Sequence, residues 1–223
     1  MISIVIPYIG DEASKAIMAK IEKNIKETTS EAFEIIPVED SGFASLAQTY
    51  NHGFKCASGD VLVNMHNDVE LPQDWDVPLS SAARAGFIGC VFVDESESDC
   101  ESRGIEKAGN KYIPSCCFSV SRETWNKLGG YDEQFLGFHW EDTDLFLRAA
   151  AIGRGPARCD VTVKHNRAVT RSQVAFEVDE AYMANNFKRY RDKHKALFDM
   201  TGKVQILTLP DKANYFCKEE VTL

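Results

Sequence analysis

The sequence has no long hydrophobic run. Nowhere among its 223 residues do about 20 consecutive apolar residues occur, which is the length that a membrane-spanning helix needs. Its start lacks a basic segment followed by a cleavage site, so we expect a cytoplasmic protein, soluble or peripherally associated with a membrane. No cysteine pair has CxxC spacing, and the seven cysteines are an odd number. We therefore expect reduced, mostly buried thiols and no zinc knuckle.

Basic residues are too few for a protein that binds nucleic acid. The chain has 25 Lys and Arg against 34 Asp and Glu, a net charge of −9, whereas a nucleic-acid-binding surface needs a positive excess. A nucleotide ligand is not excluded, because a divalent cation held by carboxylates reverses the local field. The length suits one hydrophobic core, and we expect a domain over 1–173 with a helical extension, 174–223, packed on it.

Short β-branched strands alternate with helical segments along the chain. This alternation predicts an α/β fold with a doubly wound, mostly parallel sheet, in which ligands bind beyond the carboxyl ends of the strands. Pro7 is expected to end the first strand, and Gly59 to end a helix in the left-handed conformation. The acidic loop 94–107 is interpreted as a solvated loop. The predicted strands are 2–6, 33–38, 61–65, 87–93, 115–120 and 161–163, and the predicted helices are 12–26, 44–57, 121–129, 141–153 and 179–198.

The polar cluster His66-Asn67-Asp68 follows the strand predicted over 61–65. A hard divalent cation such as Mg²⁺ or Mn²⁺ prefers carboxylate oxygens and shares its shell with substrate phosphates, so Asp68 is a candidate ligand. An imidazole from His66 suits Mn²⁺ better than Mg²⁺. The same three residues also fit a polar turn that merely ends a strand.

A second cluster, Glu141-Asp142-Thr143-Asp144, places three carboxylates at a predicted helix start, after the aromatic segment Phe138-His139-Trp140. One of these carboxylates is a candidate general base, and the aromatic rings are candidates for contact with a sugar. Acidic residues in a first turn also stabilise a helix simply by complementing its dipole.

Four segments, which together cover most of residues 1–170, are SIVIPYIG (3–10), EIIPVEDSG (34–42), NHGFKCASGDVLVNMHNDVELPQDW (51–75) and CCFSVSRETWNKLGGYDEQFLGFHWEDTDLFLRAAAIG (116–153). In this order they resemble a family-2 glycosyltransferase of the GT-A fold. The third segment resembles the family's helix and strand that lead into the metal-binding D-x-D motif, and the fourth resembles its acceptor-side glycine-rich loop and ED motif.

The resemblance implies two sets of site residues. On the catalytic side, Asp142 matches the general base and Glu141 would orient it or bind acceptor. Asp68 matches the last D-x-D position and is the expected ligand of Mn²⁺ or Mg²⁺, whereas the first position is His66 instead of aspartate. His165 matches a histidine that reaches the metal or diphosphate in some relatives, although such a histidine also fits a purely structural role. The residues expected to bind the nucleotide sugar are Pro7, Tyr8, Glu39, Asp40, Asp60, Asn67 and Trp140.

The function implied is inverting transfer of a sugar from a nucleoside-diphosphate donor, of UDP or dTDP type, to a glycan or glycoconjugate hydroxyl. Trp140 and Tyr131 are candidates for a floor on which a sugar stacks. The family's Gln-x-x-Arg-Trp segment is absent after Gly153, which favours single transfer over polymer synthesis. Two alternatives stay open, a non-catalytic sugar- or nucleotide-binding module and a nucleotidyltransferase. The basic helix near the C-terminus is interpreted as a solvated helix on the core, or as a surface for an anionic membrane or partner domain.

Overall fold

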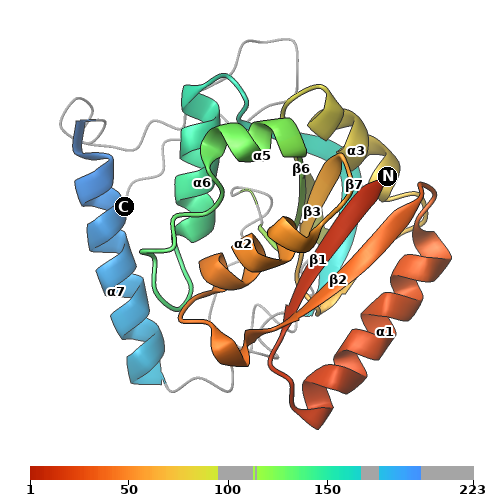
Figure 1. Cartoon of the computed structure of the whole chain (residues 1–223), viewed down its shortest axis with the longest axis horizontal. Helices are drawn as coiled ribbons and strands as arrows, with labels where there is room; N and C mark the ends of the chain where they lie inside the picture. Colours follow the sequence, from red (N-terminus) through yellow and green to blue (C-terminus); the bar gives the residue numbers. More distant parts are fainter. Residues whose placement is uncertain (95–112, 114, 167–175, 197–223) are drawn as a thin grey trace.

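A computed structural model describes residues 1–94, 113, 115–166 and 176–196 (Figure 1). Strands and helices alternate as the sequence predicts. In chain order the elements are β1 (Ile2–Tyr8), α1 (Glu12–Thr28), β2 (Phe33–Glu39), the 3-10 turn η1 (Asp40–Gly42), α2 (Leu46–Cys56), β3 (Val61–Met65), β4 (Val69–Glu70), α3 (Asp76–Arg84), β5 (Ile88–Asp94), β6 (Cys117–Ser121), α5 (Arg122–Leu128), α6 (Glu141–Ala151), β7 (Pro156–His165) and α7 (Phe176–Lys193).

Seven strands form one mixed sheet in the order β2-β1-β3-β6-β5-β7-β4. Strand β1 pairs in parallel with both β2 and β3, and β5 pairs in parallel with β7. Strand β6 runs antiparallel to both of its neighbours, β3 and β5, and the short β4 is antiparallel to β7. The carboxyl ends of β1, β2 and β3 therefore meet at one edge of the sheet, where the polar clusters were expected.

Helices cover both faces of the sheet, as a doubly wound fold requires (Figure 1). On one face, α1 and α3 bury apolar side chains such as Ile21 and Leu79 against the strands. On the other face, α2, α5 and α6 do the same through Phe54, Trp125 and Leu145. Helix α7 lies outside these layers, beside α6 and on the opposite side of the molecule from α1.

Several local predictions from the sequence are confirmed. Ser121 caps α5, where its side chain accepts a hydrogen bond from the Thr124 amide, and Gly129 ends that helix in the left-handed conformation with φ 73°. The described cysteines are free thiols, and four of the five are buried. The acidic loop 94–107 falls almost wholly outside the described residues, so its interpretation stays a prediction. So does the division of the chain at residue 173.

Two predicted strand and helix ends are wrong. Strand β1 continues past Pro7 to Tyr8. Its pairing with β3 stops at Val5, so beyond that residue β1 pairs with β2 alone and can include a proline. Gly59 is not left-handed, and α2 ends in an extended Ala57. Glycine is needed at position 59 for a different reason, since a Cβ there would lie 2.6 Å from the Met1 carbonyl oxygen.

Other differences concern elements that the sequence pattern did not reveal. The two-residue strand β4 and helix α3 were not predicted, and α7 begins at Phe176 instead of residue 179, whereas its predicted end at residue 198 lies outside the described residues. Among the described residues, no helix is both long and apolar enough to cross a membrane.

Candidate active site

Four of the residues expected to bind the nucleotide sugar lie where β1 and β2 end. Tyr8 and Glu39 are register partners at the last position of the parallel pair, so Pro7, Tyr8, Glu39 and Asp40 lie together at this edge. The Asp40 carboxylate accepts a hydrogen bond from the Thr49 hydroxyl of α2. The edge therefore holds carboxylates beside an aromatic ring, a combination that can contact a base and a ribose.

Three potential metal ligands lie close together at the neighbouring strand ends. One donor atom each from His66, Asp68 and His165 lies within 4.8 Å of the other two. The Oδ1 atom of Asp68 is 3.1 Å from Nε2 of His165, yet Oδ1 has no hydrogen-bond partner among the described residues. A carboxylate oxygen and an imidazole nitrogen that lie this close without forming a hydrogen bond are well placed to bind the same cation.

Antiparallel pairing brings these ligands together. Strand β4 pairs with the end of β7 so that Val69 faces His165, and the Asn166 amide donates to the Asp68 carbonyl oxygen at 2.9 Å. The His66 amide donates to the Cys116 carbonyl oxygen at 2.8 Å, which extends the β3–β6 ladder to the cluster.

Burial and mutual contact decide the charges of the cluster. Burial, followed by the neighbouring His165, lowers the pKa of His66 to about 4, so this imidazole is neutral near pH 7. Burial alone would lower the pKa of His165, but the Asp68 carboxylate and the Cys116 thiol more than offset it and raise that pKa to about 10. The pKa of Asp68 is lowered because its interactions with His165 and His66 outweigh burial. Without a cation His165 is therefore protonated, and it would have to release that proton to join Asp68 and the neutral His66 as a ligand of Mn²⁺.

The second pair of carboxylates begins helix α6. Glu141 is buried and its Oε2 atom has no hydrogen-bond partner among the described residues. Burial, together with the charge of Asp142, raises the pKa of Glu141 to about 8, so this group is mostly a neutral acid at pH 7. Asp142 is half-buried, and its Oδ1 accepts a hydrogen bond from the Thr143 amide at 2.6 Å.

The candidate metal ligands and the α6 carboxylates lie on the same side of the molecule. The negative charges of Asp68 and Asp142 both act to raise the pKa of His66. Burial raises the pKa of Tyr50, and the charges of Glu141 and Asp68 contribute to that shift. Because such interactions weaken with distance, Asp68 and Asp142 both lie near His66, and Asp68 and Glu141 both lie near Tyr50. The sequence alone left this juxtaposition open.

Three expected residues are placed differently. Asp60 precedes β3 and therefore lies at the amino end of the strands, where it pairs with the Met1 amino group at 2.8 Å and with Arg84 at 3.1 Å. The expectation that it sits near the nucleotide pocket is wrong. Tyr131 is 4% exposed and its hydroxyl donates to Asn64, so it cannot form a stacking floor. The Trp140 ring packs against Phe187 and Tyr190 of α7, which leaves less of it for a sugar.

Asn67 lies between the two metal-ligand candidates in sequence and is 6% exposed. Its Nδ2 atom has no hydrogen-bond partner among the described residues. A buried amide donor without a partner is costly, and it fits a site that binds an oxyanion beside the cluster.

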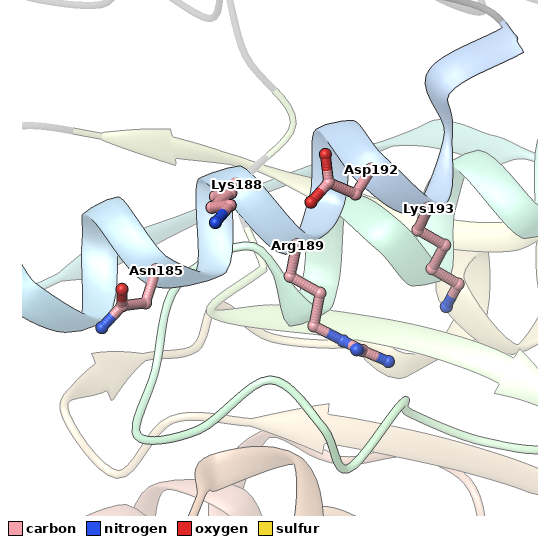
Figure 2. A pocket seen from close by; sticks show the side chains of 5 residues that line it. All are labelled: Asn185, Lys188, Arg189, Asp192 and Lys193. Atoms are coloured by element: carbon pink, nitrogen blue, oxygen red, sulfur yellow. The ribbon is translucent and has the colours of Figure 1, made fainter.

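The part of the chain that the structure describes also forms surface hollows away from this cluster, among them the following two. The described residues that line one of them belong to α7 (Figure 2). Two of these, Arg189 and Lys193, pair with Asp132, each at 2.8 Å. These two basic residues are thus paired within the chain, which favours the interpretation of α7 as a helix packed on the core. The other hollow is lined by Pro72, Gln73, Asp74, Trp75, Val77, Pro78, Asp160, Val161 and Thr162.

Sequence reasoning missed the residues of α7 that support the site. Asn186 is 3% exposed and donates hydrogen bonds to the loop before α6, and Asp179 binds His139 of that loop. The sequence feature that could have revealed them is an asparagine and an aspartate on the buried face of a largely polar helix.

Comparison with known proteins identifies the fold. A family model described as the N-terminal domain of galactosyltransferase matches residues 95–171. No curated protein matches the chain. The structure of GalNAc-T7 with UDP, GalNAc and Mn²⁺ is similar over 86% of this chain and 47% of its own, with TM-score 0.63 and 14% identity. The chain spans less than two thirds of that protein.

Two further solved structures are similar. The mannosyltransferase PcManGT from Pyrobaculum calidifontis, in complex with GDP-Man and Mn²⁺, matches over 87% of this chain and 64% of its own, with TM-score 0.60 and 13% identity. A mutant of Drosophila β1,4-galactosyltransferase 7, in complex with manganese, UDP-Gal and xylobiose, matches over 81% of this chain and 79% of its own, with TM-score 0.51 and 15% identity. The chain therefore has the GT-A fold that the sequence resemblance implied.

Proposed function

We propose that this chain is a metal-dependent glycosyltransferase that moves a sugar from a nucleoside-diphosphate sugar to a hydroxyl of a glycan or glycoconjugate. The observation that carries the proposal is the compact set of His66, Asp68 and His165, which lies on the same side of the molecule as Asp142. The GT-A fold and the match to a galactosyltransferase domain support it.

The cation site would be formed by His66, Asp68 and His165. Solved structures of similar fold contain Mn²⁺ or manganese, and two imidazoles beside a carboxylate suit Mn²⁺ better than Mg²⁺. When bound, the cation supplies Lewis-acid stabilisation of the departing diphosphate. The residue at the first D-x-D position is His66, and its neutral imidazole belongs to the ligand set instead of disrupting it.

The donor nucleotide, of UDP or dTDP type, would lie along the ends of β1 and β2. Tyr8 and Pro7 would contact the base, and Asp40, with Glu39, would accept hydrogen bonds from the base or ribose. The unpartnered Nδ2 of Asn67 would donate to a diphosphate oxygen. The solved structures of similar fold contain UDP, GDP-Man or UDP-Gal as the nucleotide bound to those proteins.

Asp142 is the proposed general base. In this mechanism the acceptor oxygen forms a bond to the anomeric carbon while the bond from that carbon to the diphosphate breaks, and Asp142 takes the hydroxyl proton. One direct displacement inverts the anomeric configuration. Glu141 would stay protonated, because it is buried beside Asp142, and would donate a hydrogen bond that orients Asp142 or the acceptor.

The proposal is tested with a panel of nucleotide sugars, each offered with Mn²⁺ or with a chelator. A ligand that binds only the native state raises the apparent stability, so at least one UDP- or dTDP-sugar should raise the melting temperature when Mn²⁺ is present. Product analysis should then find nucleoside diphosphate. With pyrophosphate added, its consumption to form nucleoside triphosphate and sugar 1-phosphate would instead indicate a nucleotidyltransferase, and binding without any product would indicate a non-catalytic module.

A further inference from the structure

The segment that leads into Asp142 has an unusual backbone. His139 and Trp140 have φ values of 81° and 72°, and Gly137 has a φ of 64°. A positive φ brings the Cβ of an ordinary residue close to backbone atoms, so two successive non-glycine residues in this conformation are costly. Such a conformation persists only where surrounding contacts impose it. Helix α6 begins directly after it, with Glu141 and Asp142.

One side chain of α7 holds the backbone of this segment. The side-chain nitrogen Nδ2 of Asn186 donates hydrogen bonds to the carbonyl oxygens of Leu136, Phe138 and His139 at 2.8, 3.0 and 3.1 Å. Asn186 is 3% exposed, so water does not readily replace these bonds. A single amide therefore orients three carbonyl groups just before the site carboxylates.

Other contacts from α7 act on the same segment. The Asp179 carboxylate lies 2.7 Å from Nε2 of His139, and the ring of Trp140 packs on those of Phe187 and Tyr190. Gly137 lies against Tyr182, because a Cβ at Gly137 would be 2.5 Å from that ring. Helix α7 thus contacts each left-handed residue of the segment.

We propose that α7 is a clamp for the active site, and that Asn186 is a positioning residue which holds the left-handed segment and so sets the position of Asp142. The inference rests on the proposed function. Asn186 acts only through the loop and is not expected to touch either substrate. Its loss should lower turnover by roughly 10- to 100-fold, the scale expected when a catalytic group is misplaced by about 1 Å.

The neighbouring Asn185 provides a matched control. It has the same side chain, on the same helix, but is exposed and lines the surface hollow on α7 (Figure 2). Asn186→Ala and Asn185→Ala therefore delete the same groups from adjacent positions. The first position is buried against the left-handed segment, and the second is exposed.

The first experiment compares these two variants of the full chain. For Asn186→Ala we expect a lower kcat with a KM for the nucleotide sugar close to that of the wild type, and faster amide hydrogen exchange in the first turn of α6. Asn185→Ala should match the wild type in both. Equal kcat and equal exchange in the two variants would overturn the clamp. If Asn186→Ala fails to fold, Asp179→Asn replaces it, because this substitution keeps the size of the side chain. Asp179→Asn must then lower kcat, and an unchanged kcat would overturn the clamp proposal.

A second experiment tests the backbone mechanism itself. His139→Gly and His139→Ala both remove the imidazole, but only glycine adopts a positive φ without steric cost. If Asn186 acts by holding that conformation, Asn186→Ala should lower kcat less in the His139→Gly background than in the His139→Ala background. An equal loss in both backgrounds would contradict the mechanism.

Failure of this inference is distinguishable from failure of the proposed function. A wild-type chain that transfers no sugar would remove the proposed function, yet faster exchange at α6 in Asn186→Ala alone would still show that α7 orders the segment. An active wild type with two indistinguishable asparagine variants would remove the clamp and leave the transferase.

Discussion

His165 Nε2 lies 3.1 Å from Asp68 Oδ1, although the two residues are far apart in the chain. The antiparallel pairing of β4 with β7 creates this proximity, because it sets Val69 opposite His165. A two-residue strand thus determines whether the histidine can join Asp68 and His66 in binding a cation.

Removing one ligand should weaken the binding of Mn²⁺ itself. Asp68→Ala and His165→Ala each delete a donor atom from the cluster, and loss of a coordinating group should lower Mn²⁺ affinity by at least about tenfold. Calorimetric titration with Mn²⁺ measures the effect. His52→Ala is the control, because His52 is an exposed histidine of α2, and it should bind Mn²⁺ as the wild type does. Unchanged affinity in both ligand variants would remove the cluster as the metal site.

Losing the proposed base should affect chemistry and spare binding. Asp142→Asn keeps the shape of the side chain but cannot take the acceptor proton, so turnover should fall roughly 10²- to 10⁴-fold while the affinity for the nucleotide sugar changes little. Steady-state kinetics and calorimetry measure the two quantities. The exposed Asp160 allows the same substitution as a control, and turnover in Asp142→Asn equal to that in Asp160→Asn would exclude Asp142.

Glu141 should make the protein less stable as pH rises. Its pKa is about 8 in the folded state, against 4.5 for an ordinary glutamate, so between these values the native state binds more protons than the unfolded state. The contribution of Glu141 to stability is full below about pH 4.5 and is lost as pH rises through 8. Glu141→Gln, which stays neutral, should therefore gain stability relative to the wild type.

The gain should grow between pH 5 and pH 8 by a few kcal/mol, because each unit by which the folded-state pKa exceeds the unfolded one is worth about 1.4 kcal/mol. Urea unfolding of both proteins at the two pH values, without added metal, measures it. A difference in the free energy of unfolding that is the same at both pH values would contradict the raised pKa.

A buried aspartate joins α6 to the C-terminal helix. The Asp144 side chain is 0% exposed and lies 2.7 Å from both Arg148 and Lys193, and 2.9 Å from His194. Asp144→Ala would leave cationic partners without their counter-charge, so we expect a loss of about 3 to 5 kcal/mol in the free energy of unfolding.

Chemical denaturation checks that value, with Glu123→Ala as the control. Glu123 forms an exposed ion pair with Lys127, and its removal should change stability little. If the two variants unfolded at the same denaturant concentration, Asp144 would not anchor the helix.

Local chemistry made much of the fold predictable. The β-branched strands, the Ser121 cap and the left-handed Gly129 follow from short-range preferences, and the structure confirms them. Strand β6 was also found, but its antiparallel direction depends on contacts across the sheet, which the pattern of one segment does not report. The same limit applies to β4, which is too short for a periodic signal.

The site was predictable in its residue types and less so in their placement. Asp60 follows Gly59 and precedes β3, and the rule that ligands bind beyond the carboxyl ends of strands should have excluded it. His139 and Trp140 adopt left-handed conformations because α7 holds them, and no preference of histidine or tryptophan predicts this. The role of Asn186 arises only from packing between segments far apart in the chain.

One measurement tests the central claim most directly. It follows the release of nucleoside diphosphate from a nucleotide sugar in the presence of acceptor, with Mn²⁺ either supplied or chelated. We predict sugar transfer to the acceptor that requires Mn²⁺ and stops when the ion is chelated. Transfer at the same rate in the presence of chelator would contradict a cation held by His66, Asp68 and His165.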